Sequence, residues 1–576
     1  MRYPTLSPPR TSREMIDVFG GYHHSLRIGE GEFYEMENLS SDRYPILSPR
    51  GKRGVYAASG DLRGMIAKDA LCYIDGSDFV MDGTHVPMGL TAEEKPKTLV
   101  SMGAYVIIMP DKKYINTADL SDFGRIEASA ETSSEVRFSL CALDGTDYGD
   151  APAGKSAPEN PENLALWIDT SASPHVLRQY SASAGVWSAV SATYIKISSP
   201  GIGAPFALHD GVQITGILGE TLSGLNGSAI IRARGENFVA VDGILDAPLT
   251  QSAGYPVRLE RKMPDVDFLI ESENRLWGCR YGDGVNEIYA SKLGDFRNWS
   301  CFMGVSTDSY AASVGTDGAF TGAVAHLGYP LFFKENCVHK VYGTHPANFQ
   351  IRTTVLRGVQ KGSERSLATV GETLYYKSRA GVCAYDGSLP TEISDGLGDI
   401  AYGNAAAGAL GNKYYISMSD ESGAYHLFVY DTVRNMWHRE DGTQAIAFCA
   451  HRGELYYVDY ATEQIRTVKG TGVTENEPVR WSAVTGFIGT DSPDKKYVSR
   501  LDVRMMLEVG ARVSFFAEYD SGGEYEYLFS MTGKSLRSFS VPIRPKRCDH
   551  LRLRIVGEGE AKIFSICKTT EWGSDA

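Results

Sequence analysis

The chain has 576 residues, of which 43% are hydrophobic and 22% charged, a balance that excludes wholesale disorder and predicts several packed domains. Its formal net charge is −14, with 71 acidic and 57 basic side chains. A protein that wraps DNA is normally basic, so this charge disfavours that class, whereas an acidic surface lets nucleic acid slide past without sticking.

We expect no secretory signal at the start of the chain. Its first thirteen residues, MRYPTLSPPRTSR, are broken by proline and lack the apolar stretch of a secretory signal. No run of about 18 apolar residues follows, so we expect a soluble product, made in the cytoplasm, without a membrane-spanning helix. The nine cysteines stand singly without a CxxC pair, which favours reduced, buried thiols over a disulfide framework or a zinc site.

Short strands and tight turns are expected throughout. Glycine (61 residues) and tyrosine (32) are abundant, and no long amphipathic helical pattern occurs, so we predict an all-β chain. Residues 1–50 carry five prolines and too few apolar residues for a core of their own. We expect this segment to be an extended arm that packs against the rest of the chain or a neighbouring copy.

One structural unit recurs along the chain. A strand of small residues leads through a Gly or Asn turn into an aromatic strand, followed by two further strands. Five copies have their second strands at Leu276, Leu331, Leu374, Lys413 and Leu455, spaced 39 to 55 residues apart, and two earlier copies start at Arg63 and Lys97. A period of about 40 to 50 residues with four strands is typical of a β-propeller, so we predict about seven blades. A β-sandwich with chance spacing is the alternative.

The predicted propeller is interrupted and extended. Its two parts cover residues 51–126 and 259–475. Residues 127–258 differ from them in sequence pattern and are expected to form an inserted β-domain. Residues 476–576 predict a C-terminal β-sandwich. The expected strands there are 500–509, 512–519, 525–529, 537–541 and 550–555, the last with Leu551, Leu553 and Ile555 on its buried face.

Motifs for catalysis or metal binding are weak. Gly149–Ser156 fits GxxxxGK[ST], but prolines 158 and 161 prevent the helix that a phosphate loop needs, so we predict a linker. His23 and His24 are adjacent on a strand and point to opposite faces, which disfavours a metal site. Two carboxylate pairs, Asp265 with Asp267 and Asp283 with Glu287, could serve a glycosidase but are more typical of turns and surfaces.

Two residue sets are candidate contact sites. The densest basic patch is a solvated strand face or a subunit interface, and consists of Arg544, Lys546, Arg547, Arg552 and Arg554. Three aromatic residues of the insert are either its core or a platform on which host glycans stack: Trp167, Tyr180 and Trp187.

Several motifs resemble those of phage stabilisation proteins, which are similar to the tail-hub or nozzle proteins that plug short phage tails after DNA packaging. The segment 275–309 is similar to that family in the pattern RLWG…NEIYASKLGD…NW, and residues 36–50 in the pattern NL…P…PR. Residues 552–566 are also typical of the family. The insert segment 161–187 resembles a short module common in phage tail fibres, although compact nozzle proteins lack such an insert.

The resemblance implies a β-propeller body with added β-domains and a ring of copies, six in number, around the DNA exit channel. It implies neither catalytic residues nor a cofactor. The main hypothesis is therefore a non-enzymatic virion protein that sits below the portal or adaptor, retains packaged DNA and passes it without sequence-specific binding. The alternatives are a tail-tip protein that binds host glycans through the insert and, last, a propeller glycosidase.

Overall fold

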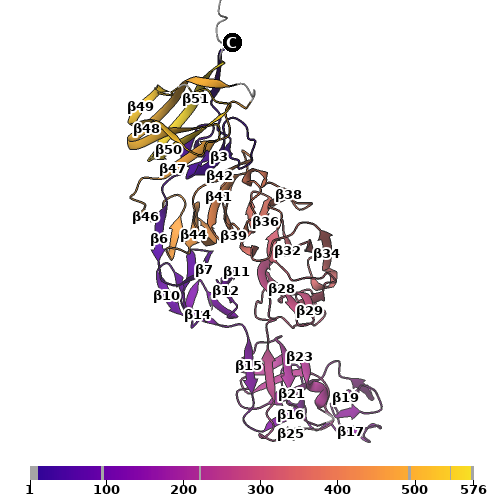
Figure 1. Cartoon of the computed structure of the whole chain (residues 1–576). Coiled ribbons are helices and arrows are strands. Elements are labelled where there is room, and N and C mark those ends of the chain that lie inside the picture. The colour runs from indigo at the N-terminus through magenta and orange to yellow at the C-terminus, as the bar shows by residue number, and fades with distance from the viewer. Residues whose placement is uncertain (1–10, 93–95, 220–221, 491–494, 545, 573–576) are drawn as a thin grey trace, which may run out of the picture.

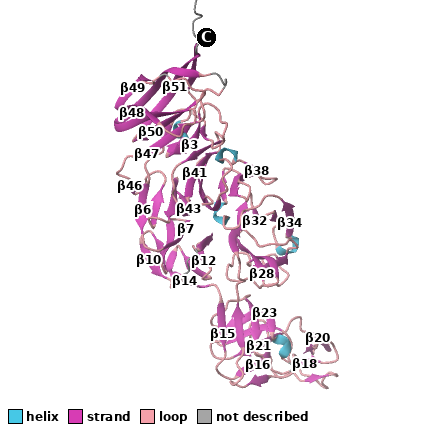
Figure 2. Cartoon of the chain, in the orientation of Figure 1, coloured by secondary structure: helices cyan, strands magenta, loops and turns pink. Residues whose placement is uncertain are grey.

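The chain is built almost entirely from β-strands. The computed structural model describes residues 11–92, 96–219, 222–490, 495–544 and 546–572. Figure 1 shows three lobes in a row, with the C-terminal lobe at one end, a propeller in the middle and the insert at the other end. In the described residues, the helical elements are five short 3₁₀ turns, scattered among the strands in Figure 2: η1 (Ser41–Arg43), η2 (Ser223–Leu225), η3 (Pro346–Asn348), η4 (Glu364–Ser366) and η5 (Asp395–Leu397). None of the helices found in the described ranges is long and apolar enough to cross a membrane.

The middle lobe is a seven-bladed propeller, which confirms the predicted fold class. Blades 1 and 2 consist of β7 (Leu62–Ala67), β8 (Leu71–Asp75), β9 (Asp78–Met81) and β10 (Thr84–Pro87), then β11 (Thr98–Met102), β12 (Tyr105–Met109), β13 (Lys113–Asn116) and β14 (Asp119–Arg125). Blades 3 and 4 consist of β27 (Phe268–Ser272), β28 (Arg275–Gly282), β29 (Val285–Ala290) and β30 (Tyr310–Ser313), then β31 (Gly322–His326), β32 (Tyr329–Lys334), β33 (Cys337–Tyr342) and β34 (Gln350–Val355). Blades 5 and 6 consist of β35 (Ala368–Val370), β36 (Thr373–Lys377), β37 (Val382–Tyr385) and β38 (Thr391–Glu392), then β39 (Gly403–Leu410), β40 (Lys413–Ser419), β41 (Tyr425–Asp431) and β42 (Met436–Arg439).

Blade 7 joins distant parts of the chain. Its inner strands are β43 (Ala445–His451), β44 (Glu454–Asp459) and β45 (Gln464–Thr467), and its outer strand is β6 (Gly54–Ala58), which also pairs with the short β46 (Val473–Thr474). The innermost strand of this blade contacts those of blades 6 and 1. Contacts of β7 with β11, β11 with β27, β27 with β31, β31 with η4 and β35 with β39 complete the circle.

The residue pattern of the blades follows from their wedge shape. Innermost strands converge on the axis and therefore carry small residues, such as Ala405 to Ala407 in β39. A Cβ atom on Gly408 would lie 2.5 Å from that of Phe448 in the next blade, so close packing at this position excludes a side chain. Second strands lie further out and carry the aromatic core, in which Phe332, Tyr414 and Tyr457 are fully buried.

The insert hangs on two antiparallel strands, β15 (Ala128–Glu131) and β26 (Arg258–Arg261). They belong to an eight-stranded sheet with its own apolar core, completed by β16 (Val136–Cys141), β21 (Tyr194–Ser198), β22 (Gly211–Thr215), β23 (Gly227–Gly235), β24 (Phe238–Asp242) and β25 (Leu249–Gln251). A smaller sheet projects from it, formed by β17 (Ala153–Gly154), β18 (Leu166–Asp169), β19 (Val176–Ser181) and β20 (Val186–Ala189). Asn298 of blade 3 is fully buried and ties the insert to the propeller, because its side chain bonds to the backbone of His209 and Gly211 at 2.7 and 3.2 Å.

The C-terminal lobe is built on two long strands. Four strands were expected between residues 500 and 541, but β48 (Lys496–Tyr519) and β49 (Glu526–Val541) run through both predicted breaks. One half of β48 pairs with β51 (Ala561–Trp572) and the other with β50 (Leu551–Glu558), so the strand bends from one layer of the sandwich into the other. Residues Leu551, Leu553 and Ile555 face the core as predicted.

The N-terminal arm completes this lobe and joins it to the propeller. β1 (Thr11–Ile16) pairs with β51, and β3 (Glu32–Glu37) pairs with β47 (Arg480–Thr485). The sheet continues through β2 (Gly21–Tyr22) to β42 of blade 6, while β4 (Leu39–Ser40) and β5 (Ser48–Pro49) form a small ladder beside it. One apolar core extends through the sandwich, the arm and blades 5 and 6, so these parts are one packed unit.

Candidate functional site

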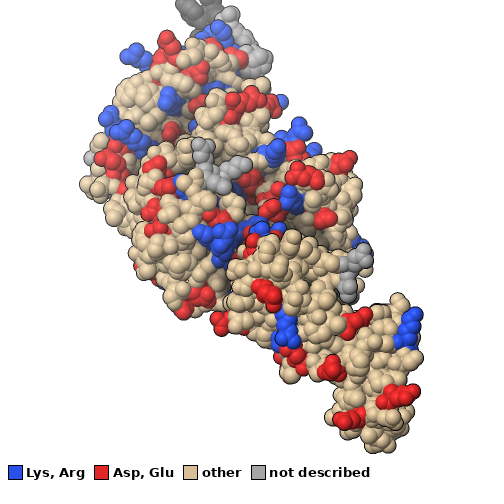
Figure 3. Space-filling view, turned by 90° about the horizontal axis from the view of Figure 1, so that it is seen from below, with Lys and Arg blue, Asp and Glu red and all other residues tan. Residues whose placement is uncertain are grey.

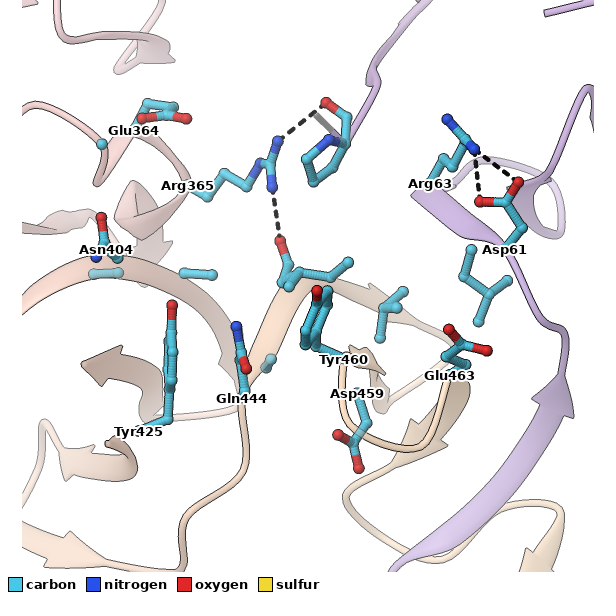
Figure 4. Close-up of a pocket in the computed structure, with 18 of the residues that line it drawn as sticks. Asp61, Arg63, Glu364, Arg365, Asn404, Tyr425, Gln444, Asp459, Tyr460 and Glu463 are labelled. Carbon is cyan, nitrogen blue, oxygen red and sulfur yellow. Dashed lines mark hydrogen bonds and ion pairs between the residues drawn. The ribbon is translucent and has the colours of Figure 1, made fainter. Parts of the chain in front are cut away.

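A cavity of about 480 Å³ opens at the propeller axis (Figure 4). It is lined by the starts of the inner strands β7, β39 and β43, by the segment before β35, by Pro96 and by the turn between β44 and β45. Five blades thus supply side chains to one space: the polar lining residues are Asp61, Arg63, Glu364, Arg365, Asn404, Tyr425, Gln444, Asp459, Tyr460 and Glu463.

Arg365 links three segments around the cavity. Its guanidinium donates hydrogen bonds to the backbone oxygen of Ile446 in blade 7, at 3.2 Å, and of Pro96 just before blade 2, at 3.1 Å. Burial lowers the pKa of Arg365, and the charge of neighbouring Glu364 opposes that shift. Because the side chain starts just before β35 of blade 5, its guanidinium links that segment to blade 7 and to the segment before blade 2 across the cavity (Figure 4).

A second arginine of the cavity is neutralised. Arg63 makes a bidentate ion pair with Asp61, with N–O distances of 2.7 and 2.8 Å, and bidentate pairs are geometrically specific. Asp459 is also engaged: it accepts a hydrogen bond from the amide of Ala461 at 3.1 Å and lies 3.8 Å from Arg466. Asn404, at a φ of +48°, donates to the hydroxyl of Ser419.

The remaining polar side chains are available to a ligand. Within the described ranges, five of them make no hydrogen bond or ion pair: Glu364, Tyr425, Gln444, Tyr460 and Glu463. Figure 4 shows Tyr425, Gln444 and Tyr460 with their polar ends turned toward the side on which Arg365 lies. Tyr460 is 61% exposed at the rim, and Glu463 is exposed.

Sequence reasoning missed this cavity and pointed to other acids. Neither of the two expected carboxylate pairs lines the cavity. Asp265 and Asp283 both form ion pairs with Arg280 at 3.2 Å, Asp267 accepts a bond from the amide of Tyr281, and Glu287 accepts one from Ser313. Burial raises the pKa of Asp267. Each of these four acids thus has a hydrogen-bond or ion-pair partner in blade 3.

The five basic residues expected to form a patch have two kinds of surroundings, solvent and aromatic rings. Arg544, Lys546 and Arg547 are exposed, and Lys546 forms an ion pair with Glu526. Arg552 is partly buried between the rings of Tyr34 and Phe487, 4.2 and 3.9 Å from their centroids, a cation–π arrangement within the lobe. Arg554 is exposed, 5.6 Å from the ring centroid of Tyr525.

The three aromatic residues of the insert meet on one face of the small sheet. Trp187 lies 5.6 Å from Trp167 and 5.3 Å from Tyr180, measured between ring centroids. Trp167 is 7% exposed and donates its indole N–H to the backbone oxygen of Gly154. Its ring is therefore packed inside the cluster, while Tyr180 and Trp187 are partly exposed.

The other motifs have structural partners. The expected linker Gly149–Ser156 contains β17, which pairs in parallel with β18. His23 faces Glu32 at 3.1 Å and His24 the backbone oxygen of Tyr34 at 2.8 Å, so the two rings have separate partners. No cluster of three or more metal-ligating side chains occurs in the part of the chain that the structure describes. All nine cysteines are free, and seven of them are buried.

Comparisons with known proteins identify no family for this chain. No family model and no curated sequence matches the chain. Similar solved structures include the propeller domain of the Trilobed protease from Pyrococcus furiosus (10% identity, 72% of this chain and 96% of that one, TM-score 0.29) and BamB from Moraxella catarrhalis (10%, 76% and 96%, 0.27). An exo-beta-1,3-galactanase from Phanerochaete chrysosporium matches at 9% identity over 52% of this chain and 94% of its own, with a TM-score of 0.21. These scores carry no functional argument.

Proposed function

We propose that this chain is a non-enzymatic structural protein of a phage tail hub or nozzle, which assembles into a ring below the portal or adaptor, retains packaged DNA and forms part of the ejection conduit. The proposal rests on the motifs that resemble phage stabilisation proteins. The proposal is supported by the contacts of these motif residues, which join one lobe of the chain to another.

The N-terminal motif forms a joint between three parts of the chain. Asn38 donates its side-chain amide to the backbone oxygen of Arg480 at 2.9 Å and its backbone amide to that of Glu440 at 2.6 Å. Its side-chain oxygen accepts a bond from Arg50 at 2.8 Å. The arm, the sandwich and blade 6 thus meet at Asn38, as expected of a component that transmits mechanical load.

The longer motif builds blade 3 and the seat of the insert. Arg275 is 2% exposed and donates to the backbone oxygens of Ser291, Ser306 and Asp308, which fixes the long connection between β29 and β30. Asn298 of the same connection bonds to the insert, as described above. The residues that carry the resemblance therefore position one lobe relative to another.

The conduit in this proposal lies between copies. Arg365 bridges the inner ends of blades 5 and 7 and the segment before blade 2, and the DNA of this proposal passes through a channel enclosed by neighbouring chains. Heterologous contacts generate such a closed ring. The insert, residues 127–258, holds fourteen acidic and seven basic side chains, and acidic walls repel phosphates. Figure 3, viewed from the insert's end of the molecule, shows acidic and basic patches interspersed among larger uncharged areas.

Negative-stain electron microscopy of the full chain across a concentration series tests the assembly. We expect closed rings with a central opening wide enough for duplex DNA. A parallel titration with duplex DNA at physiological salt should show weak binding without sequence preference. Single propellers at every concentration, with and without the portal or adaptor as template, would contradict the ring. Tight duplex binding would contradict the sliding surface.

A further inference from the structure

The axial cavity has the chemistry of a saccharide site. We propose that it binds a neutral mono- or disaccharide, a function that goes beyond assembly and needs only a single copy of the chain. The inference starts from the five polar side chains that line one cavity without a partner in the described residues. Polar groups of a folded protein usually find partners or face water singly, and five that line one cavity are suited to a polyhydroxylated ligand.

Hydroxyl groups of a sugar both donate and accept, so their site needs both kinds of group. Glu364 and Glu463 supply acceptors, and Gln444 supplies a donor and an acceptor. The hydroxyls of Tyr425 and Tyr460 can do either. The lining residues therefore suit the ring of hydroxyl groups of a sugar. They do not suit an anion, because the two carboxylates would repel it.

An aromatic ring at the rim supplies the apolar part of recognition. Tyr460 is 61% exposed, although a tyrosine in a protein core or turn usually buries most of its ring. Stacking of the C–H face of a pyranose on such a ring removes apolar surface of both from water. The cavity of about 480 Å³ lies within the range of small-molecule sites and has room for one or two sugar rings.

The charges of the cavity lining leave a negative excess, which disfavours an anionic sugar. Asp61 is neutralised by Arg63, and Arg466 lies 3.8 Å from Asp459. Arg365 stands next to Glu364 in sequence and its charge is inside the cavity. Glu364 and Glu463 form no ion pair in the described residues, and Arg466 also pairs with Glu475 at 2.5 Å, so a polyamine is the competing ligand that the test must separate from a sugar.

Saturation-transfer NMR with the full chain tests the proposal. The probes are glucose, galactose, mannose, rhamnose and N-acetylglucosamine, with maltose, lactose and chitobiose, each at millimolar concentration. We expect at least one to give a saturable signal. Tyr460→Ala and Glu463→Gln should each weaken its apparent affinity by about tenfold or more, and both positions are exposed, so folding should be retained.

The chain offers matched controls. Tyr255→Ala removes a tyrosine that is 59% exposed on the insert, and Glu421→Gln neutralises an exposed acid outside the cavity lining; both should leave binding unchanged. A probe set without any saturable signal would overturn the proposal, and so would binding that survives both cavity variants. A signal with spermidine and with no sugar would assign the cavity to a cation instead. Ring formation is measured in a separate experiment, so a failure to form rings is distinguishable from a failure to bind sugars.

Discussion

Arg53 is the most deeply buried cation at the joint between the arm and the propeller. It is 1% exposed and contacts Glu440 at 2.5 Å and Asp441 at 2.8 Å. Removal of one partner from a buried ion pair leaves an uncompensated charge, at a typical cost of about 3–5 kcal/mol. We therefore expect Arg53→Met to lower the free energy of unfolding by that order, as measured by urea denaturation.

A surface pair provides the control for this variant. Arg500 is 60% exposed and lies 2.9 Å from Asp502. Exposed ion pairs contribute about 0–1 kcal/mol, so Arg500→Met should have a small effect. Equal losses of unfolding free energy in Arg53→Met and Arg500→Met would contradict the expected effect of burial.

Buried histidines predict a dependence of stability on pH. Burial lowers the pKa of His339 to about 4, with help from the charge of Lys334, and both ring nitrogens lie 2.9 Å from threonine hydroxyls. Burial likewise lowers the pKa of His438 to about 3. Unfolding restores the ordinary value near 6.5, so the unfolded chain binds more protons between that pH and the folded pKa.

The sign of the effect follows directly. Stability is complete above pH 6.5 and falls on acidification, by up to about 1.4 kcal/mol per pH unit for each such histidine. Burial would raise the pKa of Asp441, but the charge of Arg53 keeps it low, so this carboxylate adds a loss at still lower pH. Urea unfolding between pH 7.5 and 4.5 measures the slope, and His339→Gln should reduce it. An unchanged slope would contradict the assignment.

At the scale of elements, the bend of β48 depends on a close backbone approach. A Cβ atom on Gly533 of β49 would lie 2.5 Å from the backbone oxygen of Glu508, beside the bend. The backbone must shift to admit it, and such overpacking typically costs about 1–3 kcal/mol. We expect Gly533→Ala to lower the melting temperature of the chain, as measured by calorimetry. Gly51→Ala, with no atom within 4 Å of its Cβ position, should leave the temperature unchanged.

The blades were predictable from sequence, and the long strands were not. Each blade is wedge-shaped and therefore needs a strand of small residues followed by an aromatic strand. This pair of strands recurs in every blade, so the repeat is visible in the sequence. The break expected near Gly510 has a local cause as well, because that glycine has a φ of +88°, yet pairing with β49, β50 and β51 carries the strand through it. Local residue preference cannot show which partner a strand will find.

The axial cavity could not be predicted for a related reason. Glu364, Gln444 and Glu463 lie far apart in sequence or in turns that resemble every other polar turn of the chain. Only the closure of the ring brings them together. The carboxylates that did stand out are close in sequence, Asp265 to Asp267 and Asp283 to Glu287. In the structure Asp265 and Asp283 contact the same arginine, Arg280.

At the scale of the whole molecule, the insert is expected to be separable. Ala128 and Arg261 are directly paired, so the two ends of the insert lie next to each other, and the insert has its own core. Replacement of residues 128–261 by a short Gly-Ser linker should leave the main thermal transition of the propeller and sandwich, as measured by calorimetry. The isolated segment should melt separately. Loss of the main transition would show that the contact through Asn298 is required for folding.

The pairing of chain ends also sets the order in which the molecule can be made. β6 finds its partner β45 about 400 residues later, and β1 waits for β51 near the end of the chain. During translation these early strands emerge from the ribosome long before their partners exist, whereas the insert meets all of its strands within one stretch. A chain that terminates prematurely after residue 475 has all the strands of the seven blades but no sandwich around its arm, so only completed translation yields the finished C-terminal lobe.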